Sequence, residues 1–445
     1  MGKLFGTDGI RGIVGDDLTT ELAMKIGESS AYVLGKREDD LVVLIGRDTR
    51  ISGQMLTSAI SAGLMSEGAK VIDLGVVPTP LVSYLVKKYN ASMGVMISAS
   101  HNPSEYNGIK LFNNEGFKLP DRIEFEIERY LFGKGIPTSS KIGTYNICNT
   151  AIEDYTKYLE STAKDIDKDL KIIVDCAYGS ASTTAPILFK KLGLNVEFIN
   201  YEYDGYNINR NAGSTHIEGL IEKVISTKSD IGIAYDGDAD RCLIVDENGD
   251  VVDGDEIMAI CAYDLKQQGI LTNNTLVGTV MSNLGLSKFC EQNNINFEAT
   301  KVGDRYVLEK MLESGYILGG EQSGHVIFKE HSNTGDGELT SIQILNILSR
   351  EKKKLSELKT IMKKYPQVLL NIPVTEEGKI KLETDSEIAT TIRQVEDSLG
   401  KDGRVLVRAS GTENIIRVMI EGLEQEDIDA KAKKIGSKIK KKFGS

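Results

Sequence analysis

The chain of 445 residues lacks the features that mark membrane, secreted or nucleic-acid-binding proteins. No apolar run approaches the roughly 18 residues that a membrane span needs, and the first residues lack the apolar core of a signal peptide. The five cysteines are odd in number, widely spaced and without a CxxC pair, which indicates reduced and mostly buried thiols. The formal net charge of -12 argues against a nucleic-acid surface. We therefore expect a cytoplasmic protein that binds neither nucleic acid nor membrane.

The most informative feature that is present is a run of alternating aspartates, Asp236, Asp238 and Asp240, followed at once by Arg241. Apolar segments on either side predict two short buried strands, so the carboxylates should lie in a loop at a strand end. Three converging carboxylates repel each other unless a cation lies between them, and hard oxygen ligands favour Mg²⁺, Mn²⁺ or Ca²⁺. A solvated acidic turn is the alternative interpretation.

An EF-hand calcium loop would also use acidic residues at this spacing. The sixth position of such a loop makes a sharp turn and requires glycine, whereas the chain has Arg241 there. The flanks are also strand-like rather than helical. A small, octahedrally coordinated ion such as Mg²⁺ is therefore favoured over calcium in an EF-hand.

One pattern of strand, helix, strand and a further strand that ends in an unusual loop recurs three times. Strands are predicted at 41–45, 70–74 and 92–97, at 170–174, 195–199 and 231–235, and at 275–280, 296–300 and 316–320, with helices at 53–67, from about 181, and at 284–293. After about residue 366 come a strand, a helix at 386–399, a strand–loop–strand and a final helix. The sequence predicts three similar α/β domains with mixed sheets between helices, plus a smaller C-terminal α+β domain.

The predicted domains are residues 1–150, 151–255, 256–366 and 367–445. Each of the first three presents a loop at a strand end, where ligands gather in α/β sheets. The fourth follows its own linker and is a candidate moving lid.

The loop after the predicted strand at 92–97 contains Ser100 and His101. The dipeptide Asn107-Gly108 predicts a second turn, which would bring Lys110 back toward the loop. A turn-forming serine beside a surface histidine is the alternative. Because no carboxylate–histidine pair or GxSxG elbow is visible, a serine that carries phosphate near a metal is favoured over a hydrolase triad.

The loop of the predicted C-terminal domain fits an anion cradle. Its small residues Ser410, Gly411 and Thr412 let backbone N–H groups converge and add hydroxyl donors. Arg408 and Arg417 can fork onto phosphate oxygens. A plain β-hairpin turn is the alternative.

Two further loops combine charged and polar residues. Near the N-terminus, glycines flank Asp8 and Arg11, which suits close approach of the backbone to another charged group. Glu321, Ser323 and His325 offer an acceptor, a hydroxyl and a titratable ring, a set suited to sugar hydroxyls and proton transfer. A flexible leader and a polar turn are the respective alternatives.

In these motifs the chain resembles the α-D-phosphohexomutases, in particular the phosphoglucosamine mutases. The matching segments are 6–12, 98–103, 236–241, 302–307, 320–325 and 408–413, which span almost the whole chain in family order. Asn414 stands where the family usually has proline. The resemblance implies four domains around a central cleft.

The resemblance also implies a role for each loop residue. Ser100 would be the serine that is phosphorylated in the active enzyme. Asp236, Asp238 and Asp240, together with the Ser100 phosphate, would be the ligands of one Mg²⁺. Phosphate would be neutralised, or protons transferred, by Arg11, His101, Lys110, Arg241 and His325. Sugar hydroxyls would be bound by Glu321 and Ser323, and the distal phosphate by Arg408, Ser410, Gly411, Thr412 and Arg417. Among them His101, Lys110 and His325 are all candidates for the general base.

The implied reaction interconverts glucosamine 6-phosphate and glucosamine 1-phosphate through phosphoserine and a 1,6-bisphosphate, and supplies UDP-N-acetylglucosamine synthesis. A hexosamine 1,6-bisphosphate is the expected activator, small hexose or hexosamine phosphates the expected partners, and a monomer or homodimer the expected state. The alternatives are the same mechanism on glucose or mannose phosphates, a metal-dependent glycosyltransferase, and a non-enzymatic sugar-phosphate binding protein.

Overall fold

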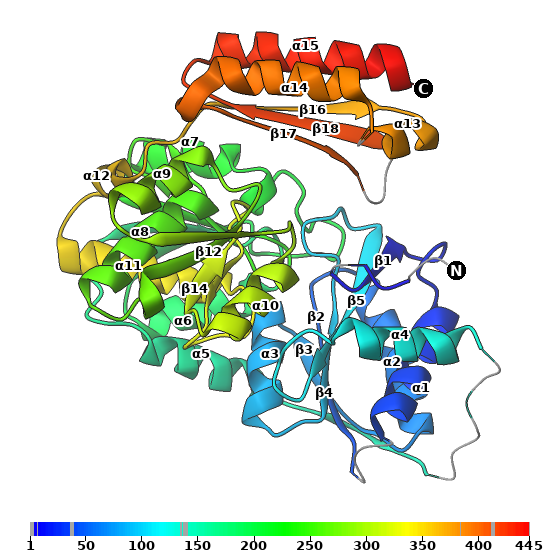
Figure 1. The fold of residues 1–445 in the computed structure, drawn as a ribbon. Coiled ribbons are helices and arrows are strands. Elements are labelled where there is room, and N and C mark those ends of the chain that lie inside the picture. The colour runs from blue at the N-terminus through cyan, green and yellow to red at the C-terminus, as the bar shows by residue number, and fades with distance from the viewer. Residues whose placement is uncertain are drawn as a thin grey trace. The chain divides into compact units, whose positions relative to one another are not determined.

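The computed structural model describes residues 4–6, 8–35, 40–133, 136, 141–382, 384–410 and 414–444. Their contacts divide the chain into two compact units (Figure 1). Unit 1 comprises Met1–Met281 and Ile295–Thr360, and unit 2 comprises Ser282–Asn294 and Ile361–Ser445. Each unit contains its own β-structure.

The first sheet of unit 1 has six strands in the order β1-β5-β4-β2-β3-β6. Its strands are β1 (Ile10–Ile13), β2 (Val42–Arg47), β3 (Lys70–Val76), β4 (Met93–Ile97), β5 (Tyr106–Asn113) and β6 (Thr144–Ile147). Strands β4, β2, β3 and β6 are parallel, whereas β5 runs antiparallel to β4 and β1. In Figure 1, α1 (Thr20–Gly35), α2 (Gly53–Ser66) and α4 (Asp121–Leu131) lie on one face of this sheet, and α3 (Thr79–Lys88) lies on the other.

The other two sheets of unit 1 have five and four strands. The five are β7 (Lys171–Asp175), β8 (Asn195–Ile199), β9 (Ile231–Tyr235), β10 (Cys242–Asp246) and β11 (Val251–Val252), and the four are β12 (Thr275–Thr279), β13 (Asn296–Thr300), β14 (Leu318–Gly320) and β15 (Val326–Phe328). The accompanying helices are α5 (Ala151–Ser161), α6 (Ala181–Lys191), α7 (Glu218–Thr227), α8 (Gly254–Gln267), α10 (Asp304–Ser314), α11 (Gly337–Glu351) and α12 (Leu355–Leu358). The strands β4, β9 and β12 are buried at every residue, which explains why few polar side chains occur in them.

All three sheets of unit 1 contain one four-strand pattern. The orders are β3-β2-β4-β5, β8-β7-β9-β10 and β13-β12-β14-β15. In each, three neighbouring strands are parallel and the fourth forms an antiparallel hairpin with the third. The serine, aspartate and histidine loops found in the sequence each connect the third strand to the fourth. The prediction of three similar α/β domains with mixed sheets is therefore confirmed.

The turn predicted at Asn107-Gly108 was wrong. Both residues lie inside β5, where Gly108 pairs with Arg11 of β1. The amide of Ser98 donates to the Gly108 carbonyl (3.0 Å), and a Cβ at Gly108 would lie 2.4 Å from the Ser98 carbonyl oxygen. The glycine is thus explained by two close-packed neighbouring backbones and not by a turn. The chain turns before β5 instead, at residues 103–106, where the Tyr106 amide donates to the Pro103 carbonyl (3.2 Å).

Unit 2 contains a three-stranded antiparallel sheet in the order β16-β18-β17, and α14 and α15 cover one face of it (Figure 1). Its elements are β16 (Gln367–Pro373), β17 (Arg404–Ala409), β18 (Ile415–Glu421), α9 (Leu284–Gln292), α13 (Glu376–Lys381), α14 (Ser386–Leu399) and α15 (Gln425–Phe443). Its core includes Ile416, Val418 and Ile420 from alternate positions of β18, together with Ile428 and Ile435 of α15. The smaller C-terminal α+β domain is confirmed, while the four domain boundaries stay predictions.

The structure can be compared with the expectations about membrane spans and cysteines. None of the helices in the described part of the chain has both the length and the apolar character of a membrane span. All five cysteines are free; four are buried and Cys148 is half-buried. The expectation of mostly buried thiols is therefore met.

The alternation along β18 can be tested by truncation. Ile416→Ala should lower the free energy of unfolding of unit 2 by about 2–5 kcal/mol, because it leaves a cavity in the core. Ile415→Ala, at the neighbouring half-buried position of the same strand, should cost less than half as much. Urea denaturation, with hydrogen exchange of the β16–β18 amides as the local reporter, compares the two. Equal losses would show that the face bearing Ile416 does not form the core.

Candidate active site

Ser100 lies in the turn that leaves β4 and is 1% exposed. Its φ of +52° is in the left-handed region, which is uncommon for a residue with a side chain. Its Oγ donates to Oδ2 of Asp236 (2.6 Å) and lies 3.3 Å from Nδ1 of His101. The structure thus brings the predicted nucleophile into direct contact with the aspartate loop.

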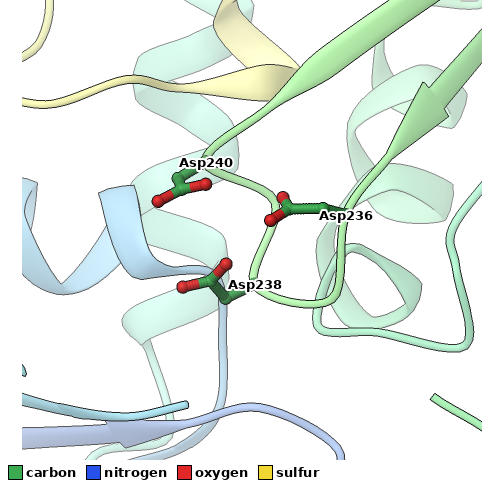
Figure 2. Close-up of side chains that lie close together, drawn as sticks. All are labelled: Asp236, Asp238 and Asp240. Carbon is green, nitrogen blue, oxygen red and sulfur yellow. The ribbon is translucent and has the colours of Figure 1, made fainter. Parts of the chain in front are cut away.

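The three aspartates of that loop converge. Figure 2 shows the carboxylates of Asp236, Asp238 and Asp240 pointing toward one another, and one oxygen of each lies within 4.8 Å of the others. All three residues are buried, and the Oδ1 atoms of Asp238 and Asp240 have no hydrogen-bond partner among the described residues. Buried carboxylate oxygens without partners are costly unless a cation binds them. The donor set therefore fits a divalent ion that prefers oxygen ligands.

The aspartates differ in how well their charges are compensated. Burial, together with the neighbouring Asp240 and Asp238, raises the pKa of Asp236 well above its usual range. Burial also raises the pKa of Asp240, but Lys110 and His325 outweigh it and hold this pKa well below its usual range. Asp236 thus has less compensating charge than Asp240, and a bound divalent ion would supply it.

Lys110 projects into the aspartate loop from β5 and is 1% exposed. Its Nζ lies 2.8 Å from Asp238, 3.5 Å from Asp240 and 3.3 Å from Asp8. Burial lowers the pKa of Lys110, but these carboxylates raise it well above its usual value. Lys110 is therefore held protonated and is a fixed positive charge rather than a free base.

The candidate arginines Arg11 and Arg241 of unit 1 lie close enough to His101 to affect its pKa. Arg11 in β1 donates to Oδ1 of Asn102 (3.2 Å) and pairs with Asp8. Nη1 of Arg241 lies 3.2 Å from Nδ1 of His101. Burial, Arg241 and Arg11 lower the pKa of His101 to about 4. Its ring therefore stays neutral at neutral pH.

His325 connects the third loop to the aspartate loop. Its Nε2 accepts a hydrogen bond from the Gly335 amide (3.0 Å), which places the ring proton on Nδ1, 3.6 Å from Asp240. Asp304 lies 3.6 Å from Nε2. Burial lowers the pKa of His325, but the nearby carboxylates, Asp240 foremost, raise it above its ordinary value. The ring is thus held between two acidic residues from different segments.

Glu321 and Ser323 lie in the same hairpin as His325. Oε1 of Glu321 accepts from the Gly303 amide (3.0 Å), and burial raises the pKa of Glu321 above its ordinary value. Oγ of Ser323 is buried and has no hydrogen-bond partner within the described residues. Such an acceptor and such a hydroxyl suit a ligand that carries several hydroxyls.

The remaining candidates belong to unit 2. Arg408 and Arg417 are direct partners across β17 and β18, and burial and Arg417 lower the pKa of Arg408 below its ordinary value. Like charges opposite each other on neighbouring strands are destabilising, which favours an anion at this position. Ser410 follows β17 and is 5% exposed, whereas Gly411 and Thr412 lie outside the described residues.

Several contacts of the site were not predicted from the sequence. Oγ1 of Thr79 donates to Oδ2 of Asp238 (2.6 Å). Nζ of Lys118 binds Asp8 and lies 2.5 Å from Asp304. Thr79 and Lys118 are isolated polar residues that no local pattern distinguishes. Only the position of their carboxylate partners in the fold reveals them.

Comparison with known proteins identifies the family of the chain. Domain descriptions of phosphoglucomutase/phosphomannomutase match four segments, namely α/β/α domain I at 2–135, domain II at 153–249, domain III at 253–365 and the C-terminal domain at 369–435. The chain belongs to the phosphoglucomutase/phosphomannomutase family. The resemblance to the phosphohexomutases inferred from the sequence is thereby confirmed.

Individual relatives agree with the family. A phosphoglucosamine mutase of Acetivibrio thermocellus is 51% identical over 449 residues, with 100% of both chains covered. A phosphoglucomutase/phosphomannomutase family protein of Burkholderia thailandensis has a TM-score of 0.81 at 25% identity, with 98% of each chain covered. An N-acetylphosphoglucosamine mutase of Aspergillus fumigatus, in complex with GlcNAc-6P and magnesium, shares the fold with a TM-score of 0.71 at 17% identity, covering 98% of this chain and 95% of that one. A mutase is therefore supported over a glycosyltransferase or a non-enzymatic binding protein.

The metal site can be tested by titration with Mn²⁺ in place of Mg²⁺. The electron paramagnetic resonance signal of Mn²⁺ makes its binding measurable. Asp240→Asn should weaken Mn²⁺ binding at fixed pH by at least about 10-fold, because it removes one of three converging charges. Asp250→Asn, at an exposed aspartate outside the cluster, is the matched control and should leave the affinity unchanged. Equal affinities for Asp240→Asn and the native chain would contradict a metal site here.

Proposed function

We propose that the protein interconverts glucosamine 6-phosphate and glucosamine 1-phosphate by phosphoryl transfer through Ser100. The proposal depends above all on the 2.6 Å contact between Ser100 Oγ and Asp236, within a buried group of carboxylates that fits a divalent ion. A hydroxyl in such a place is suited to carrying and donating phosphate. Glucosamine as the sugar is supported by the half-identical relatives that are named phosphoglucosamine mutase.

In the proposed cycle, phosphorylated Ser100 donates its phosphoryl group to the C1 hydroxyl of glucosamine 6-phosphate. The bond from Oγ to phosphorus breaks, a bond from phosphorus to the sugar oxygen forms, and the hydroxyl proton passes to a base. The resulting 1,6-bisphosphate turns end for end and returns its 6-phosphoryl group to Ser100, leaving glucosamine 1-phosphate. A hexosamine 1,6-bisphosphate would serve as the activator by phosphorylating Ser100 in the same way.

Charge compensation in this cycle is assigned to the residues around Ser100. Asp236, Asp238 and Asp240, with an oxygen of the Ser100 phosphate, would hold one Mg²⁺. When bound, the ion supplies positive charge to the phosphoserine and to the group in transfer. Lys110, which is held protonated, adds a fixed positive charge beside the same carboxylates.

Proton transfer is assigned to the two histidines. His101 is neutral, and its Nδ1 lies 3.3 Å from Ser100 Oγ. Nδ1 of His325 lies 3.6 Å from Oδ2 of Asp240 in the aspartate loop. Arg11 and Arg241 would neutralise phosphate oxygens. Glu321 and Ser323, as further members of the site, would bind sugar hydroxyls.

Binding of the phosphate that is not reacting is assigned to unit 2. The proposed ligands are Arg408, Ser410 and Arg417, together with Gly411 and Thr412. Binding energy from this remote phosphate would position the reacting hydroxyl for transfer. A mobile C-terminal domain with the predicted boundary at residue 367 would accept the sugar in either orientation.

Several expectations from the sequence are carried forward with this proposal. They are a cytoplasmic location, a monomer or homodimer, and small hexose or hexosamine phosphates as the partners rather than nucleic acid or membrane. Rates with glucose 6-phosphate and mannose 6-phosphate, compared with glucosamine 6-phosphate, would decide the choice of sugar.

The decisive variant is Ser100→Ala. Interconversion of the two glucosamine phosphates, followed by ³¹P NMR with Mg²⁺ and catalytic glucose 1,6-bisphosphate, should fall by at least about 10⁴-fold, because the phosphoryl carrier is removed. Circular dichroism should show an unchanged fold. The control is Ser104→Ala in the same loop, which should retain activity. A Ser100→Ala enzyme with more than a tenth of native activity would disprove the proposed carrier.

The arginine pair gives a separate prediction about binding. Arg417→Gln should raise the KM for both glucosamine phosphates by roughly 10- to 100-fold, because charged hydrogen bonds to phosphate are lost. Steady-state kinetics in both directions measure the effect. Arg393→Gln, on the outer helix α14 of the same unit, is the control. An unchanged KM for Arg417→Gln would place the remote phosphate elsewhere.

A further inference from the structure

Arg50 is a buried arginine at the centre of the serine loop, and the proposed reaction gives it no role. Its side chain is fully buried. Its two terminal nitrogens donate to four carbonyl oxygens of one loop, those of Ser100 (2.9 Å), Asn102 (2.8 Å), Pro103 and Tyr106 (3.0 Å). The planar guanidinium thus replaces the backbone partners that this irregular segment lacks.

Arg50 is also linked to the backbone amide of Ser100, through two other side chains. Nε of Arg50 donates to Oδ2 of Asp48 (2.9 Å), which in turn accepts from Oγ of Ser98 (2.6 Å). Oγ of Ser98 accepts from the Ser100 amide (2.9 Å). Both the amide and the carbonyl of Ser100 are therefore tied to Arg50, one through two intermediates and one directly.

A second residue binds the loop from another segment. Nδ2 of Asn209 donates to the carbonyls of Ser100 (2.9 Å) and Asn102 (3.1 Å). The neighbouring Gly237 approaches so closely that a Cβ there would lie 2.5 Å from the Ser100 carbonyl oxygen. The Ser100 carbonyl is thus bound to the segment that carries the aspartate loop.

These contacts explain the unusual backbone of Ser100. A left-handed conformation at a residue with a side chain persists only where its surroundings fix it. Here Arg50 and Asn209 fix the carbonyl, and this leaves Oγ directed at Asp236. Both donors bind backbone oxygens, so neither needs to touch the transferring group.

We propose that Arg50, assisted by Asn209, is a positioning residue for phosphoryl transfer that holds Ser100 in line with the aspartate loop. The proposal rests on the proposed function of Ser100. Lysine cannot replace the arginine, because one ammonium nitrogen cannot reach the four carbonyls that the guanidinium binds in a fixed plane. A displacement of the nucleophile of about 1 Å can cost roughly 100-fold in rate.

The test is Arg50→Lys in the full-length enzyme. Its kcat per phosphorylated chain, with phosphorylation counted by intact mass, should fall by roughly 100-fold. The KM for glucosamine 6-phosphate should stay within about 3-fold, since no substrate ligand is changed. Counting phosphorylated chains separates misplacement of Ser100 from simple loss of folded protein.

The matched control is Arg47→Lys, three residues earlier. Arg47 pairs with Asp73 through Nη1 at 2.9 and 3.1 Å, and within the described chain its side chain makes no hydrogen bond or ion pair with the serine loop. It should lose stability without loss of kcat per phosphorylated chain. If Arg50→Lys behaves in the same way, Arg50 is merely structural and the proposal is wrong.

A second variant covers the case in which Arg50→Lys does not fold. Asn209→Ala removes two hydrogen bonds and leaves Arg50 in place, and should lower kcat per phosphorylated chain by about 10-fold. An unchanged value would overturn the proposal. Failure of the proposed function would be different in kind, because the native chain itself would then neither interconvert the sugar phosphates nor carry phosphate at Ser100.

Discussion

Repulsion among Asp236, Asp238 and Asp240 is the constraint around which unit 1 is built. Carboxylates that are removed from water repel each other far more strongly than carboxylates at a surface. The chain relieves part of this repulsion with Lys110 from another sheet and with the His325 ring. Two of the carboxylate oxygens still have no partner among the described residues. The negative charge that remains uncompensated favours a bound cation. Because the same charge opposes convergence of the aspartates, other contacts must hold the surrounding loops in place.

The threefold repeat explains how loops of different chemistry come to serve one site. In each copy the loop connects the third parallel strand to its antiparallel neighbour. Ligands gather at the carboxyl ends of parallel strands, so the same hairpin is available three times. The first copy uses it for Ser100, the second for the aspartates, and the third for His325. Repetition of the backbone supplied the positions, and the loop sequences supplied separate chemical roles.

The sequence predicts best where a local pattern and a buried position coincide. Strands β9 and β10 match the apolar segments that flank the aspartates, and α14 spans the predicted 386–399. Strand β6 is exposed at every residue and therefore has no apolar pattern to detect. Asn107-Gly108 misled because a turn and a tightly packed strand both favour a small residue.

Site residues follow the same rule. Members of one loop, such as Asp236, Asp238 and Asp240, can be predicted as a group, because consecutive residues at a strand end share a location. Partners from distant segments cannot, as with Thr79, which lies 159 residues from Asp238 in sequence. Arg50 stands in a polar run directly after β2, much as the aspartates follow β9. The position of Arg50 at a strand end could have marked it as a candidate site residue. Its hydrogen bonds to the backbone carbonyls could not be predicted, because they depend on the folded backbone.

The roles proposed for the two units make different physical demands. Placement of a nucleophile depends on short hydrogen bonds, whose strength falls steeply with distance and angle, and Ser100 is accordingly fixed through both its amide and its carbonyl. Recognition of a remote phosphate depends mainly on charge, which acts over longer distances and tolerates a change in ligand orientation. Under the proposed function, the two arginines that face each other on the sheet of unit 2 would meet that requirement. A substrate that must react at either end therefore needs one rigid site for chemistry, and a simpler cationic site for whichever phosphate is idle.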